Sequence, residues 1–234
     1  MSRLARTVAA LAALIGWAGL AIQAYILIEN MGVTAAIWRF LGFFTILANV
    51  GAAGVATAIA AGSRGTLVQP AARLMAATAI VAVGIIYSVA LRAYWHPTGL
   101  QKVADVLLHD ATPLLGLTVW LLAPHSRLRW AQAGWAIVPP AAYAAYAMIR
   151  GVADGWYAYW FFDPASQSIW EIVTSTILLL WAFALVGVVL VALDQWFGAR
   201  SGPLEPLRAN RVDEAGLESF PASDPPGWTL GEDR

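Results

Sequence analysis

Six long apolar runs alternate with short polar segments along the first two hundred residues. They cover 7–28, 38–61, 73–92, 102–122, 130–149 and 169–197. An α-helix needs about 20 apolar residues to cross the hydrocarbon core of a bilayer, and each run has this length or more. The pattern predicts an all-α polytopic membrane protein, a six-transmembrane-helix bundle formed by residues 1–200.

The ends and one connection of this bundle are less regular. The first run is long for a signal peptide, which favours a retained helix over a cleaved one. We expect Pro139 and Pro140 to bend the fifth helix. Residues 151–169 are rich in aromatic side chains and too short to span, so they form either an interfacial aromatic belt or a lid over an outward site. Five prolines among acidic and small residues predict a disordered cytoplasmic tail over 201–234.

Composition and charge agree with a membrane protein. The chain is 60% hydrophobic and 12% charged, and its mean hydropathy is +0.66. It contains no cysteine, which excludes disulfides, thiolate metal sites and cysteine nucleophiles. Eleven of the fourteen basic residues precede position 201, a density too sparse for a nucleic-acid surface. The expected partners are therefore membrane lipids and a lipid-like substrate, and not nucleic acid.

Basic residues near the predicted helix ends set the orientation, because they accumulate on the cytoplasmic side. One side holds seven, namely Arg3, Arg6, Arg64, Arg73, Arg127, Arg129 and Arg200. The other side holds four, namely Arg39, Arg92, Lys102 and Arg150. This asymmetry predicts that both termini are cytoplasmic.

The fourth run contains ionisable residues where they are costly. His109 lies seven residues after Lys102, roughly 10 Å into the membrane at the 1.5 Å rise of an α-helix. Pro113 has no N–H, so it leaves the carbonyl of His109, four residues earlier, without its helical partner. Asp105 lies one turn from His109 on the same face and could orient the imidazole. Intramembrane ionisable groups are usually functional, and the alternative is a histidine that only hydrogen-bonds between helices.

Thr45 in the second run lies at the same depth as His109, seven residues after Trp38. A neutral histidine within hydrogen-bond reach could take the threonine proton and make its hydroxyl a nucleophile. The amide of Asn49, one turn deeper, could stabilise an oxyanion. These are the parts of an acyl-transfer site. The structural alternative is a threonine that bonds its own backbone at i−4.

Other polar groups support weaker interpretations. Arg92 with Ser88 could bind an anionic head group or pair with Asp105. Glu171 is either a site residue or an acid whose carboxylate reaches the interface. His96 and His125 fall in loops on opposite sides, which disfavours haem, and zinc by His109, Asp105 and His96 lacks a recognised spacing. We therefore predict no cofactor and no metal.

Three motifs resemble the androgen-induced-gene family of six-helix membrane proteins, in particular its bacterial branch. They are FFTILANV in the second run, LLHDATPLL in the fourth, and the RG…WYAYWFFDP stretch after the fifth. The resemblance covers about residues 38–185, and Asn49 fits the bacterial form better than the animal one. It implies a bacterial plasma-membrane protein with six membrane helices.

Animal members of that family are atypical hydrolases that cleave esters of branched hydroxy fatty acids with a threonine nucleophile and a histidine. By resemblance, these roles fall on Thr45 and His109. The resemblance therefore implies an integral-membrane lipid-ester hydrolase, with Asn49, Asp105, Arg92 and Glu171 as supporting or substrate-binding residues. The alternative is a non-catalytic bundle that binds lipids or transports a small solute through the same polar cluster.

Overall fold

The computed structural model describes residues 1–125 and 127–200, and every regular element within these ranges is helical. The tail predicted over 201–234 lies outside the described residues. The eight α-helices in the described part are α1 (Arg3–Met31), α2 (Val33–Phe40), α3 (Phe44–Ala60), α4 (Pro70–Ile86), α5 (Gly99–Val106), α6 (Thr112–Leu122), α7 (Val138–Asp154) and α8 (Ile169–Arg200).

Shorter helical turns connect or extend these helices. Two are π-helical, η2 (Tyr87–Leu91) after α4 and η3 (Leu107–Ala111) between α5 and α6. Three are 3₁₀-helical, η1 (Thr66–Val68), η4 (Trp130–Ile137) and η5 (Trp160–Phe162).

The described part of the chain holds four helices that are long and apolar enough to cross a membrane. They are Arg3–Met31, Pro70–Leu91, Gly99–Leu122 and Ile169–Ala199. The pair α2 and α3 makes a fifth candidate if it counts as one broken span. The protein is thus all-helical with several membrane-spanning candidates.

Two predicted helices differ in detail. The second helix begins at Val33 instead of 38, and it is bent by 81° between Phe40 and Phe44. In the fifth, Pro139 and Pro140 lie in the first turn of α7, after the 3₁₀ turns of η4. Proline is tolerated there because the first-turn N–H groups have no helical partner. The two prolines therefore start α7, whereas the sequence predicted a bend within a longer helix.

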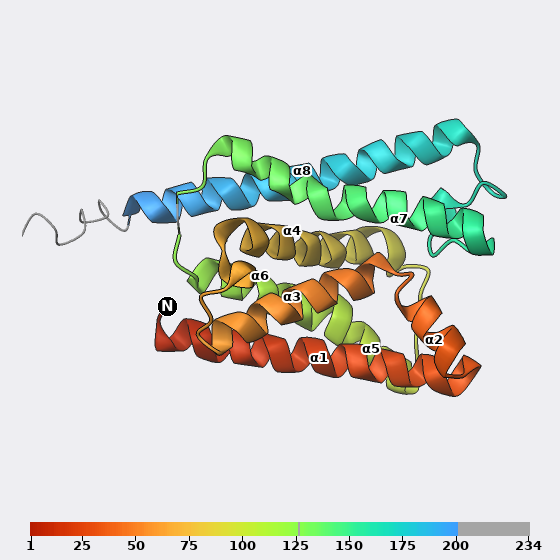
Figure 1. The fold of residues 1–234 in the computed structure, drawn as a ribbon, viewed down its shortest axis with the longest axis horizontal. Coiled ribbons are helices and arrows are strands. Elements are labelled where there is room, and N and C mark those ends of the chain that lie inside the picture. Colours follow the sequence, from red (N-terminus) through yellow and green to blue (C-terminus); the bar gives the residue numbers. More distant parts are fainter. Residues whose placement is uncertain (126, 201–234) are drawn as a thin grey trace, which may run out of the picture.

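Helix α4 lies at the centre of the bundle. It packs against α3 and α6 on one side and against α8 on the other, while α1 runs along α3 and α6 (Figure 1). Small residues make the α1 contact close: a Cβ added at Gly16 would lie 3.1 Å from the Cβ of Ala53. Small residues are the usual means by which membrane helices approach one another.

Large apolar side chains cover much of the outer surface. Four large side chains on the long helical segments are each more than 60% exposed, namely Leu14, Leu114, Leu178 and Trp181. In water such a surface would promote aggregation, whereas in lipid it is the favourable one. The fold therefore has the surface of an integral membrane protein.

Candidate active site

His109 lies within the π-helical turn η3. The extra residue of a π turn shifts the backbone register, and such turns are frequent at functional sites. The second π turn, η2, lies on the neighbouring helix and begins at Tyr87. The rings of Tyr87 and His109 stack with their centroids 3.9 Å apart and their planes 14° from parallel. The two irregular turns therefore meet at the histidine.

Asp105 lies beside the imidazole of His109, one turn along the helix. Nδ1 of the ring makes a 3.2 Å hydrogen bond with the Asp105 carbonyl oxygen and lies 3.0 Å from Oδ1 of the carboxylate. Its Oδ2 accepts a 2.6 Å hydrogen bond from the Tyr87 hydroxyl, and the residue is 8% exposed. A neutral imidazole carries one proton, and the carboxylate draws it to Nδ1. Nε2 is then the nitrogen that can accept a proton.

The π turn also changes which carbonyl Pro113 leaves open. The N–H of Thr112 donates to the carbonyl of Leu107, five residues back. In this register the next donor would be residue 113, a proline without an N–H. The Leu108 carbonyl instead accepts from Nδ2 of Asn49 at 3.3 Å. The sequence argument assumed an unbroken α-helix and therefore considered only the carbonyl of His109.

Thr45 owes its position to the break between α2 and α3. It is the second residue of α3, in a first turn that has no preceding helical carbonyl four residues back. Four other threonines donate their hydroxyls to i−4 carbonyls within helices: Thr7, Thr57, Thr118 and Thr176. Thr45 does not make this hydrogen bond to a carbonyl four residues back.

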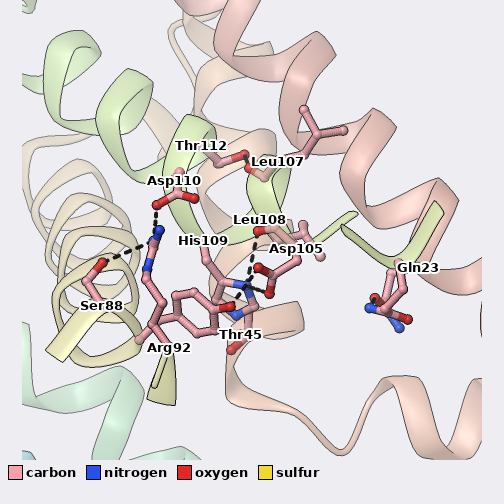
Figure 2. A network of polar contacts seen from close by, with 12 residues as sticks. Gln23, Thr45, Ser88, Arg92, Asp105, Leu107, Leu108, His109, Asp110 and Thr112 are labelled. Atoms are coloured by element: carbon pink, nitrogen blue, oxygen red, sulfur yellow. Dashed lines mark hydrogen bonds and ion pairs between the residues drawn. The ribbon is translucent and has the colours of Figure 1, made fainter. Parts of the chain in front are cut away.

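Thr45 and His109 line one cavity of about 140 Å³. Tyr87, Tyr143 and Tyr159 also line it, and its remaining walls are apolar and aromatic. Figure 2 shows Thr45 beside His109, with Asp105 behind the imidazole. The structure thus brings together the hydroxyl, the base and the orienting carboxylate that the sequence proposed, from α3, η3 and α5.

Two tyrosines of α7 hold the backbone at the break. The Tyr143 hydroxyl donates to the Gly42 carbonyl at 2.8 Å, and the Tyr146 hydroxyl donates to the Leu41 carbonyl at 3.2 Å. These bonds replace helical partners that a continuous helix would supply. They stabilise the corner between α2 and α3.

Arg150 reinforces the same corner. Its guanidinium donates to the Trp38 carbonyl and, at 3.0 Å, to the Tyr146 hydroxyl, and it lies 4.0 Å from the centre of the Trp38 ring. Asp154 accepts from Trp38 Nε1 and lies 3.6 Å from Arg150 Nε. The Trp156 backbone N–H also donates to Asp154 at 2.9 Å.

Three predicted supporting residues have other partners. Asn49 is fully buried, and its amide N–H₂ donates to the carbonyls of Thr45 and Leu108, so both N–H bonds are committed and neither can serve an oxyanion. Arg92 donates to Asp110 and Ser88, not to Asp105 (Figure 2). Glu171 accepts hydrogen bonds from the backbone N–H and the hydroxyl of Ser168 at the start of α8. It therefore belongs to the N-terminal capping box of this helix and does not line the cavity.

Tyr87 and Tyr159 are the site residues that sequence reasoning missed. Tyr87 belongs to the third predicted helix, and no local spacing relates it to Asp105. Tyr159 belongs to the aromatic stretch that the sequence predicts to be a belt or a lid. Its place in one of the three family-like motifs is the sequence feature that could have identified it. Within the described residues, no three His, Cys, Asp or Glu side chains are grouped to hold a metal ion.

Comparison of the chain with protein-family models, with curated proteins and with solved structures finds no match.

Proposed function

We propose that this protein is an integral-membrane hydrolase that cleaves fatty-acyl esters through Thr45 and His109. The observation that carries the proposal is the shared cavity. Thr45 and the base line it together, and a buried carboxylate lies 3.0 Å from the other ring nitrogen of that base. This is the nucleophile, base and orienting-acid arrangement of covalent acyl transfer.

The reaction follows from these positions. His109 Nε2 takes the Thr45 proton while Oγ forms a bond to the acyl carbon and the carbonyl electrons move to oxygen. Collapse of this adduct breaks the ester C–O bond, and the leaving alcohol receives the proton from His109. Water then attacks the threonine ester and gives a proton to His109. Breakage of the Oγ–acyl bond releases the fatty acid, and His109 returns the proton to Thr45 Oγ. Asp105 keeps Nδ1 protonated throughout and stabilises the imidazolium.

An apolar groove next to the site supports a lipid substrate. Phe44 and Tyr143 also line a second cavity, of about 450 Å³, whose walls come mainly from α3, α4 and α7. Its other walls are mostly small or aliphatic, including Ala48, Gly51 and Met75. An acyl chain that lies here keeps its ester carbonyl near Thr45 without leaving an apolar environment.

The resemblance to the androgen-induced-gene family adds support, since its two most specific motifs contain Thr45 and His109. We propose membership of the bacterial branch and location in a bacterial plasma membrane. The animal members' substrates suggest fatty-acid esters as the class to test first. Fold transfers between relatives more safely than substrate, so the site geometry carries more of the proposal than the resemblance.

We also propose six membrane crossings with both termini inside. The helical stretch from Trp130 to Asp154, formed by η4 and α7, is continuous and runs beside α8 (Figure 1). The broken pair of α2 and α3 supplies another crossing. The seven-to-four distribution of basic residues supports the orientation. A reporter fused at Ser201 that is active only outside the cell would contradict it.

The function is tested with purified protein in lipid nanodiscs, fluorogenic long-chain acyl esters and a fluorophosphonate probe. The wild-type protein should hydrolyse the esters and be labelled at Thr45, as peptide mass spectrometry would show. Thr45→Ala should lose both, whereas Thr45→Ser keeps a hydroxyl and should retain part of each.

Two matched controls separate the site from general damage. Thr118→Ala removes a partly exposed threonine whose hydroxyl bonds its own helix, and His96→Ala removes an exposed loop histidine. Both should behave as wild type. Ester turnover that survives in Thr45→Ala, or a folded protein that binds lipid without turnover or labelling, would favour the lipid-binding or transport alternative.

A further inference from the structure

The start of α3 presents two backbone N–H groups to the cavity side of Thr45. The N–H groups of Ile46 and Leu47 donate to the Phe43 carbonyl. Those of Phe44 and Thr45, the first two of the helix, lie near the hydroxyl oxygen of Tyr159. Tyr159 and Thr45 also line the same cavity. The phenol therefore lies beside the proposed nucleophile and the two first-turn donors.

The Tyr159 ring is held in place by other aromatic rings. It stacks on Phe161 with the centroids 5.2 Å apart, and it meets Phe43 and Tyr143 edge-on at 6.3 and 6.1 Å. Two torsions place a tyrosine hydroxyl, and these contacts restrict both. The phenol is thus positioned before any substrate enters, which is the condition for efficient electrostatic stabilisation.

We propose that Tyr159 is a further catalytic residue, which donates its phenolic hydrogen to the oxyanion formed when Thr45 attacks an acyl ester. This role rests on the proposed hydrolase function and replaces the one first assigned to Asn49. Tyr159 and Thr45 line the same cavity. The backbone N–H groups of Phe44 and Thr45 complete the set of donors.

The step is balanced as follows. As the Thr45 Oγ–C bond forms, the Oγ proton moves to His109 Nε2 and the C=O electron pair moves to the carbonyl oxygen. That oxygen lies beside the Tyr159 hydroxyl in the shared cavity, where rotation of the phenolic O–H about its C–O bond lets it donate to the oxyanion without movement of the ring. Collapse of the adduct returns the pair to the carbonyl and breaks the ester C–O bond. The leaving alcohol takes the proton from His109, and Tyr159 stays protonated.

The protonation state of Tyr159 suits this role. Burial raises the pKa of its hydroxyl, and the hydrogen bonds from Thr45 and Phe44 only partly oppose that effect. The phenol therefore remains a donor throughout the neutral pH range. His109, on η3, supplies the base, so proton abstraction and oxyanion stabilisation are assigned to different residues.

The test is Tyr159→Phe in nanodiscs with the fluorogenic acyl ester, which removes one oxygen and keeps the aromatic packing. Loss of one oxyanion donor lowers kcat by about 10²–10³-fold in other enzymes, and we expect a drop of this order with KM little changed. Tyr157→Phe is the control, because Tyr157 packs against Gly151 and does not line the cavity. It should leave kcat and KM unchanged.

Two further readouts keep the result interpretable. The melting temperature of Tyr159→Phe should remain near that of wild type, and fluorophosphonate labelling at Thr45 should become slower without being lost. Wild-type or increased kcat in Tyr159→Phe, with Thr45→Ala inactive, would overturn the role of Tyr159 and leave the hydrolase intact. Activity in Thr45→Ala would instead overturn the proposed function.

Discussion

The described part of the chain holds two histidine–aspartate pairs, and they differ in what surrounds them. His109 and Asp105 are 3.0 Å apart, and His125 and Asp194 are 3.1 Å apart. At His125, the second nitrogen Nε2 lies 3.2 Å from the Leu121 carbonyl, and the ring stacks on Phe197. At His109, the ring faces a cavity that contains a threonine.

The aspartates differ in the same way. Asp194 is fully buried and also accepts a 2.7 Å hydrogen bond from the Leu128 backbone, so it ties α8 to the segment after α6. Asp105 accepts from a tyrosine side chain that also stacks on its histidine. The His125–Asp194 pair is thus a structural tie, whereas the His109–Asp105 pair leaves one histidine nitrogen open. A histidine–aspartate pair is therefore a candidate active site only where the second ring nitrogen has no partner and the ring lines a cavity.

The largest expected difference is in turnover. His109→Ala should lower kcat by about 10²–10⁴-fold, the usual contribution of a general base. Combining it with Thr45→Ala should cost little more, because the two residues act as one unit. His125→Ala should keep wild-type kcat per folded molecule. Steady-state kinetics on detergent-purified variants measure all three, and equal losses for both histidines would remove the distinction.

The second prediction concerns stability. Asp194→Ala leaves His125 and the Leu128 N–H without their buried partner, and breaking a buried pair costs about 3–5 kcal/mol. Thermal unfolding in detergent should show this loss, while the surviving folded fraction keeps wild-type kcat. The matched variant at the other pair, Asp105→Ala, should combine a stability loss with a loss of turnover. An Asp194→Ala protein of normal stability would show that the pair is not a tie.

Asp105→Asn tests the difference between the two pairs more closely, since it keeps the shape of the Asp105 side chain and removes its negative charge. The imidazole retains a partner at Nδ1, but the carboxylate that stabilises the imidazolium is gone. We expect kcat to fall by about 10–100-fold, the usual effect of altering an orienting partner. This loss is smaller than that of His109→Ala because the nucleophile and base remain. Asp194→Asn should leave kcat unchanged.

The fold was partly predictable because apolar runs of bilayer length become helices almost regardless of tertiary context. The Asp105–His109 pair was predictable for a related reason, as it depends only on i,i+4 spacing within one segment. Thr45 reaches the same cavity as His109 by a different route. The depth count assumed a continuous helix from Trp38, whereas Thr45 lies in the first turn of a new helix after a break.

The features that local patterns did not predict depend on distant residues. The α2–α3 break is held by Tyr143, Tyr146 and Arg150, about a hundred positions later in the chain. Asn49 has a typical helical context, yet its amide is consumed by a carbonyl that Pro113 and a π turn leave open on another helix. Spacing identifies which groups could meet, but the register of irregular turns decides which atoms do.

The smallest expected effect is that of Tyr87→Phe. This change removes the 2.6 Å hydrogen bond to Asp105 and keeps the ring that stacks on His109. The buried carboxylate then lacks one partner, which should destabilise the protein by about 1–3 kcal/mol in thermal unfolding. Because the Asp105 contact to Nδ1 remains, kcat should fall less than in Asp105→Asn. Tyr25→Phe, at an exposed position of α1, is the control and should change neither quantity. A kcat loss as large as that of His109→Ala would mean that the Tyr87 hydroxyl itself acts in the reaction, and the division between orienting and reacting groups drawn from the two pairs would then be wrong.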